Sequence, residues 1–253
     1  MLISILTGSG TFAEKILDLV MIAVIVLISL TVHEVAHGWI AYKMGDPTAK
    51  NLGRLSLNPI KHLDPIGAIM MLLIGIGYAK PVPVNSRYFK NPKRGMALTA
   101  SAGPAANFIM AFFAALLYLV FVTFWFNAIV SGAGQFTINV FNVLFSFFLF
   151  FCVLNLSLGI FNLLPIPPFD GSRIFYVFLP EKWYFAVMKY ERYILLAVIL
   201  LLFVLPRLGI MNSSPITAVS GFFTKLFVRF WSMIPIFDGS SGTAMMILEQ
   251  SFG

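Results

Sequence analysis

Residues 16–37 read ILDLVMIAVIVLISLTVHEVAH, an apolar run that ends in two histidines and a glutamate. The apolar part, 16–32, is long enough for a membrane helix, which needs about 20 residues with some latitude. On a helix, His33 and His37 share a face, where both imidazoles can bind one zinc ion. Glu34 lies beside them, where a carboxylate can take a proton from water. Histidines that only cap a helix near the headgroups are the alternative, which is disfavoured because such residues are costly in a bilayer.

The composition is that of an integral membrane protein. Of the 253 residues, 59% are hydrophobic and only 11% are charged, whereas an average soluble domain carries about 25% charged residues. The net charge of +7 does not indicate nucleic-acid binding, because no basic patch is interleaved with aromatic residues that could stack on bases. The single cysteine, Cys152, excludes an intrachain disulfide and lies in an apolar segment. We therefore expect an all-α polytopic fold.

The apolar stretches suggest a bundle of about 4–6 transmembrane helices by the length that a span requires. The stretches are 16–40, 65–78, 96–130, 137–164, 193–206 and 216–237. The first, third and fourth are long enough to span. The fifth needs the residues before it, the second is short, and the last carries Lys225 and Arg229 on one face, as an interfacial helix or a span with snorkelling side chains would.

The basic residues predict the topology. Thirteen of the 17 Lys and Arg residues fall in 38–64, 80–95 and 165–192, whereas the turn at 131–136 has none. Basic loops face the cytoplasm, so we place the three basic stretches there and the turn outside. The segment 65–78 between two basic stretches is therefore expected to enter the membrane and return, which is allowed where protein covers its backbone.

Two stretches beside this segment have strand character. Residues 54–58 alternate polar and apolar side chains, and in 80–85 two prolines alternate with two valines. Proline suits an edge strand, so a small sheet or hairpin at the membrane face could pair with an extended peptide. An extended linker is the alternative, and the two interpretations stay open. The candidate pairing residues are Arg54, Leu55, Ser56, Val82 and Val84.

A catalytic zinc takes three protein ligands and keeps one open position. The best third ligand is Asp170 in NLLPIPPFDG, residues 162–171, where prolines end the helix before an Asp-Gly turn. If 65–78 does not span, this turn and the two histidines meet at the cytoplasmic end of the bundle. Asp238 in the similar IPIFDG sequence is a weaker candidate, and His62 and Asp64 are weaker still.

Asparagines mark two of the apolar helices. Asn107 follows SAGPAA at the start of 96–130, and Asn162 ends 137–164. An amide can donate to a carbonyl oxygen that gains charge during attack, or it can join helices by hydrogen bonds. For these two residues both roles stay open, whereas for Asn155 we favour helix packing.

Three motifs in register resemble the site-2 protease family of intramembrane zinc metalloproteases, in its compact branch without a PDZ or CBS domain. They are HEVAH at 33–37, GPAAN at 103–107 and NLLPIPPFDG at 162–171. The resemblance implies one zinc ion bound by His33, His37 and Asp170, with Glu34 as general base. It also implies that Asn107 and Asn162 hold the substrate strand or the oxyanion.

The resulting expectation is an intramembrane zinc endopeptidase that cleaves transmembrane segments near the cytoplasmic face, as in regulated intramembrane proteolysis. We expect one membrane domain, 1–253, with a catalytic core at 16–175 and C-terminal helices of unassigned role at 176–253. A multi-pass protein of a prokaryotic plasma membrane is expected, since the chain is short and shows no organelle-targeting signal. The alternative is a divalent-cation transporter or sensor, although no internal repeat typical of transporters is visible.

Overall fold

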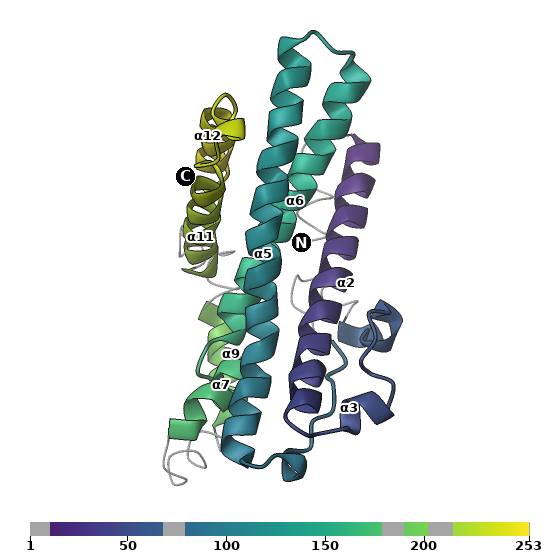
Figure 1. The fold of residues 1–253 in the computed structure, drawn as a ribbon, viewed down its shortest axis with the longest axis vertical. Coiled ribbons are helices and arrows are strands. Elements are labelled where there is room, and N and C mark those ends of the chain that lie inside the picture. The colour runs from purple at the N-terminus through teal and green to yellow at the C-terminus, as the bar shows by residue number, and fades with distance from the viewer. Residues whose placement is uncertain (1–10, 68–78, 179–189, 202–214, 253) are drawn as a thin grey trace. The chain divides into compact units, whose positions relative to one another are not determined.

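The computed structural model describes residues 11–67, 79–178, 190–201 and 215–252, and in these ranges the regular structure is helical (Figure 1). The long helices are α2 (Phe12–Lys43), α5 (Pro92–Val130) and α6 (Gln135–Asn162). These three are long and apolar enough to cross a membrane. The expectation of an all-α membrane protein is therefore confirmed. A total of 4–6 spans is not, because 68–78 and 202–206 lie outside the described ranges.

Shorter helices connect and follow the long ones. They are α3 (Thr48–Asn51), η1 (Pro59–Lys61), η2 (Ser86–Tyr88), α7 (Asp170–Phe175), η3 (Tyr176–Phe178), α9 (Glu191–Ile199), α11 (Pro215–Trp231), η5 (Pro235–Phe237) and α12 (Ser241–Phe252). The segment predicted at 216–237 is thus divided between α11 and η5. At 17 residues, α11 is at the short end of the range for a membrane span.

No strand forms in the ranges that the structure describes, and both 54–58 and 80–85 are irregular. The predicted membrane-face hairpin or sheet is therefore not confirmed. Pro81 and Pro83 lack the N–H groups that a ladder requires. The guanidinium of Arg54 donates to the carbonyls of Lys80 and Pro81, at 2.7 and 3.3 Å, where a paired strand would supply main-chain donors.

Local sequence sets both ends of α2. At its start Thr11 and Glu14 form a capping box, in which the Thr11 hydroxyl accepts from Glu14 N at 3.3 Å and the Glu14 carboxylate accepts from Thr11 N at 2.7 Å. The chain turns after Lys43 through Gly45, whose φ of 109° is a conformation that suits glycine. This turn directs the chain toward Asp46 and the loops that follow.

The chain divides into two compact units, and α5 contributes to both. The first comprises residues 1–106 and 163–186, and the second 107–162 and 187–253. In the first unit the C-terminal part of α2 packs closely against the irregular segments. A Cβ atom on Gly38 would lie 2.7 Å from Leu55 Cδ2 and 3.0 Å from Val82 Cγ1. The small residue allows this close approach.

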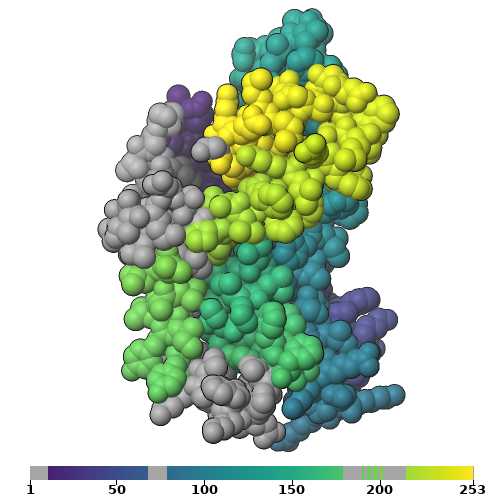
Figure 2. All heavy atoms as spheres, turned by 90° about the vertical axis from the view of Figure 1, so that its left-hand side faces the viewer, coloured from purple at the N-terminus to yellow at the C-terminus, as the bar shows by residue number. Residues whose placement is uncertain are grey.

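In the second unit α5, from Asn107 onward, runs antiparallel to α6, and α11 packs with α6 and α12 (Figure 1). Figure 2 shows α11 and α12, in yellow tones, against each other. Tyr118 donates its buried hydroxyl to Ala244 O at 3.0 Å, and Trp231 Nε1 donates to Phe112 O at 2.9 Å. These bonds satisfy polar groups inside an otherwise apolar core.

Candidate metal centre

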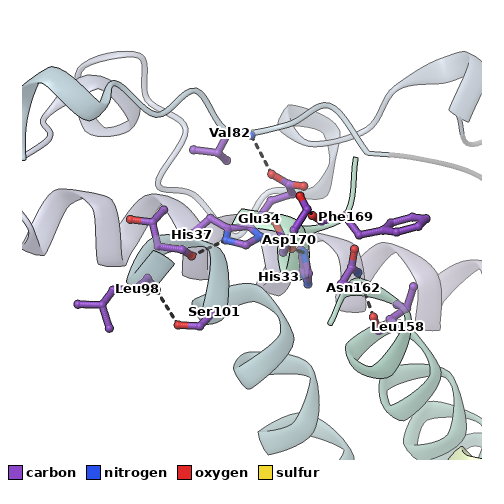
Figure 3. A network of polar contacts seen from close by, with 12 residues as sticks. His33, Glu34, His37, Val82, Leu98, Ser101, Leu158, Asn162, Phe169 and Asp170 are labelled. Atoms are coloured by element: carbon purple, nitrogen blue, oxygen red, sulfur yellow. Dashed lines mark hydrogen bonds and ion pairs between the residues drawn. The ribbon is translucent and has the colours of Figure 1, made fainter. Parts of the chain in front are cut away.

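Three side chains of the first unit converge on one point (Figure 3). The Nε2 atoms of His33 and His37 lie 3.0 Å apart. Asp170 Oδ2 lies 3.2 Å from His33 Nε2 and 3.1 Å from His37 Nε2. Among the described residues, this is the group of three that could hold a metal ion.

The spacing of these atoms suits a zinc ion. Tetrahedral ligands at about 2.0–2.2 Å from zinc lie about 3.3–3.6 Å from one another. The observed separations of 3.0, 3.1 and 3.2 Å are within a few tenths of an ångström of that range. Two imidazoles and one carboxylate are also a donor set that leaves a fourth position open, as a catalytic zinc site needs.

Hydrogen bonding determines which nitrogen of His37 faces the metal. Its Nδ1 lies 2.7 Å from the carbonyl oxygen of Thr99, which can only accept, so Nδ1 carries the proton. The Nε2 of the neutral ring then presents a lone pair to the other ligand atoms. Asp170 Oδ2 is buried, and its near neighbours are the Nε2 atoms of the two imidazoles, at 3.2 and 3.1 Å. This convergence of three potential ligand atoms fits a bound cation.

The pKa of the Asp170 carboxyl is lowered by its two histidine neighbours. Burial raises its pKa, but a protonated imidazole at His33 or His37 lowers it by hydrogen bonding and by charge, and the net pKa lies well below the ordinary value. The carboxylate is therefore ready to act as a ligand.

The two histidines owe their position to the last turns of α2. They are four residues apart, so both imidazoles emerge on one face of the helix, and both side chains are buried. Asp170 is the first residue of α7. A Cβ atom on Gly171 would overlap the carbonyl oxygens of Leu163 and Leu164, so glycine allows the chain after α6 to fold against the start of α7.

Gly103 lies directly beside the ligand nitrogens of the two histidines. A Cβ atom there would meet His33 Nε2 at 2.6 Å and His33 Cε1 at 2.5 Å, and it would also overlap His37 Nε2. The backbone of α5 therefore packs against the edges of both imidazoles. The structure thus identifies the imidazoles as the groups that Gly103 contacts.

Glu34 lies beside the ligand set and is half-buried (Figure 3). Its Oε2 accepts a hydrogen bond of 2.8 Å from the main-chain N–H of Val82. The irregular 80–85 segment thus crosses next to this carboxylate. Sequence reasoning selected Val82 for substrate pairing, whereas the structure shows its N–H bound to Glu34.

The weaker ligand candidates have other partners. His62 is buried and donates from Nε2 to Ser56 O at 2.8 Å. Asp64 accepts from the N–H groups of Ile66 and Gly67, at 3.0 and 2.9 Å. Asp238 follows η5 in the second unit and is not in the ligand group found among the described residues.

The two asparagines belong to the second unit. Asn107 is fully buried in α5. Asn162 ends α6, and its Nδ2 donates to Leu158 O of the same helix at 3.0 Å. Their roles toward a substrate stay predictions. Thr99 was not anticipated from the sequence, because it contributes a main-chain carbonyl and its side chain gives no signal.

Comparison with known proteins assigns the family. The sequence pattern of peptidase family M50 matches residues 21–205 of this chain, which include all three metal-ligand candidates. The chain belongs to peptidase family M50. This M50 protein is therefore a metalloprotease homologue with membrane-spanning helices, and zinc is its expected metal.

Several curated proteins are similar to this M50 protein. The "Putative zinc metalloprotease YwhC" of Bacillus subtilis is 42% identical over 186 residues, covering 73% of this chain and 80% of the relative. A protein named Rip2 of Mycolicibacterium smegmatis is 31% identical over 153 residues, covering 57% and 52%. A zinc metalloprotease of Methanocaldococcus jannaschii is 29% identical over 160 residues, covering 63% and 34%. The comparison with solved structures finds no match.

Proposed function

We propose that this protein is a zinc endopeptidase of the site-2 protease type that cleaves transmembrane segments of other membrane proteins near the cytoplasmic face. The observation that carries the proposal is the convergence of two imidazoles and a carboxylate on one point, with Glu34 beside it. Family membership supports hydrolysis, and the apolar helix that carries the motif supports a site within the membrane.

The residues divide the work of peptide hydrolysis. His33, His37 and Asp170 would hold zinc, which when bound polarises the scissile carbonyl and lowers the pKa of water. Glu34 takes the proton from the attacking water and delivers it to the leaving amine. The bond from His37 Nδ1 to Thr99 O, 2.7 Å long, keeps that imidazole in the tautomer and orientation that a ligand needs.

The substrate must be extended, because a helix hides its peptide bonds in its own hydrogen bonds. The 80–85 segment supports such binding through Val84. Prolines at 81 and 83 have no N–H, and the N–H groups of Val82 and Asn85 are bound to Glu34 and Asp46, at 2.8 and 2.7 Å. In the described part of the chain, Val84 keeps both its N–H and its carbonyl without a hydrogen bond.

Val84 is therefore the residue of this segment that can pair with an extended substrate through donor and acceptor together. Leu55 and Ser56, with Arg54, were the other candidates for pairing. Of these, Ser56 already accepts from His62 through its carbonyl. Asn107 and Asn162 are proposed to hold the substrate or the developing oxyanion with their amides.

The proposed cellular setting is a prokaryotic plasma membrane, with a multi-pass chain whose site opens to the cytoplasm. The clustering of 13 of the 17 Lys and Arg residues in 38–64, 80–95 and 165–192 supports this orientation. We further propose that 16–175 forms the catalytic core of one membrane domain, 1–253. A membrane protein or peptide with a transmembrane segment is the expected partner.

The deciding experiment is cleavage of a candidate transmembrane substrate in detergent by wild-type protein and by Glu34→Gln. The amide keeps the shape of the side chain but cannot accept the proton. We expect the variant to bind the same amount of zinc and to lose at least about 100-fold in kcat. Equal turnover by both proteins would reject Glu34 as the base, and zinc uptake into sealed vesicles without cleavage would favour the transporter.

A further inference from the structure

The catalytic carboxylate is held by a main-chain group. Glu34 Oε2 accepts from Val82 N at 2.8 Å in a partly buried hydrogen bond, and Val82 itself is 7% exposed. Val82 lies in a segment with no helix or strand of its own. The orientation of Glu34 therefore depends on what holds 80–85 in place.

Arg54 holds the two residues that come directly before Val82. Its Nη2 donates to Lys80 O at 2.7 Å and to Pro81 O at 3.3 Å. The Lys80 N–H donates in turn to His62 O at 2.8 Å. Charged donors form shorter and stronger hydrogen bonds than neutral ones, so the guanidinium is the strongest of these contacts.

Asp46 holds the other end of the segment. It is completely buried and accepts from Asn85 N at 2.7 Å, three residues after Val82. It also accepts from the main-chain N–H and the hydroxyl of Thr48. Val82 thus lies between two hydrogen-bonded side chains. The guanidinium of Arg54 binds the carbonyls before it, and the carboxyl group of Asp46 binds the N–H of Asn85 after it.

We propose that Arg54 is a positioning residue for the general base. Its side chain fixes the carbonyls of Lys80 and Pro81, which keeps the Val82 N–H on the carboxylate of Glu34. This inference rests on the proposed protease function and gives Arg54 a role through its guanidinium, in place of the main-chain pairing that the sequence suggested. Arg54 forms no part of the ligand set, so we expect its replacement to leave zinc bound.

The test compares Arg54→Ala with Lys61→Ala in the full-length protein. Lys61 is a matched control, because its Nζ also donates to a main-chain carbonyl, Gly53 O at 3.0 Å, but forms no hydrogen bond with the described segment 80–85. Zinc content is measured first, and kcat and KM on a transmembrane substrate are then expressed per bound zinc. Arg54→Lys is the conservative variant.

We expect Arg54→Ala to keep its zinc and to lose about 10- to 100-fold in kcat per zinc, because small misplacement of a catalytic group has effects of this size. KM should change less than kcat. Lys61→Ala should match the wild type. Arg54→Lys should recover part of the loss, since an ammonium can reach one carbonyl but lacks the planar fork.

A second measurement does not use activity. Hydrogen exchange of the Val82 amide, followed by mass spectrometry of peptides spanning 79–88, should be slow in wild type and Lys61→Ala and faster in Arg54→Ala. This measurement stays informative if no substrate is cleaved, so a failure of the protease proposal and a failure of this inference are distinguishable.

Three results would overturn the inference. They are unchanged kcat per zinc in Arg54→Ala, unchanged exchange at Val82, and loss of zinc in proportion to activity, which would make Arg54 a general structural residue. If Arg54→Ala does not fold, Arg54→Gln and Arg54→Lys replace it. Activity per zinc equal to wild type in both would then reject the positioning role.

Discussion

At the scale of single residues, the metal centre depends on a glycine as much as on its ligands. The imidazoles of His33 and His37 fill the space where a side chain on Gly103 would lie. Core positions with so little room respond to one added methyl group by strain or by movement of neighbours. Both neighbours here are proposed metal ligands, so the effect should appear in zinc binding.

We therefore expect Gly103→Ala to lower zinc affinity by about tenfold or more, in the range seen when groups around a metal site are disturbed. Gly242→Ala, also within a helix, is the control because a Cβ atom there has no atom within 4 Å. Zinc content after dialysis against a weak chelator measures the difference. Full zinc retention by Gly103→Ala would show that α5 can move away from the imidazoles.

Single residues also decide which of the two Asp-Gly sequences supplies the third ligand candidate. Asp170 lies 3.1 Å from His37 Nε2, whereas Asp238 is absent from the ligand group among the described residues. Asp170→Ala should lose most of its zinc and Asp238→Ala should keep it, as measured by elemental analysis of purified protein. The reverse pattern would assign the third ligand to Asp238.

At the scale of elements, the 80–85 segment shows how hydrogen bonds can fix the conformation of a stretch that forms no helix or strand. Side chains or carbonyls of Asp46, Arg54, His62 and Glu34 hold its main chain at four places. Among the described residues, Val84 has no hydrogen bond at its N–H or its carbonyl, and it lies two residues after the Val82 that binds Glu34. A substrate strand would therefore be recognised at one residue rather than along a ladder.

Val84→Pro and Val84→Ala separate these contributions. Both substitutions replace the valine side chain, but only the one to proline also removes the main-chain N–H of residue 84. We expect Val84→Pro to reduce kcat/KM at least about tenfold, which corresponds to the loss of one hydrogen bond of ordinary strength, while Val84→Ala stays within about threefold. Equal effects of the two substitutions would attribute the role to the valine side chain.

The sequence predicted the long helices well and the short connections poorly, for physical reasons. The runs at 96–130 and 137–164 became α5 and α6 within a few residues, because length and hydrophobicity determine such helices. The strands expected at 54–58 and 80–85 did not form. Alternation identifies residues that can be extended, but the Arg54 side chain, not a neighbouring strand, occupies the carbonyls of Lys80 and Pro81.

The candidate site shows the same division. His33, His37 and Asp170 carry side chains whose chemistry is visible in sequence, and they meet as expected. Thr99 and Val82 act through a carbonyl and an N–H, which every residue type except proline has. Their contributions follow from the fold alone, so no motif could have identified them.

At the scale of the whole molecule, the uneven distribution of charge predicts an orientation. Cys152, buried in α6, is the single cysteine of the sequence. Replacing it in a Cys152→Ala background therefore allows single cysteines to be introduced at position 61 or 131, as Lys61→Cys and Ser131→Cys. In sealed inverted vesicles, a membrane-impermeant maleimide should label Lys61→Cys and leave Ser131→Cys unreacted. Labelling of Ser131→Cys alone would indicate the opposite orientation of the chain. Labelling of the same variants in right-side-out vesicles is the matched control.

The order of the ligands along the chain has a consequence for biosynthesis. His33 and His37 leave the ribosome early, but Asp170 follows only after α5 and α6 have been made. Until then the nascent chain holds two of its three zinc ligands and lacks the turn that brings the carboxylate to them. The proposed metal site is therefore complete only late in synthesis, after α6 and the start of α7 have been made.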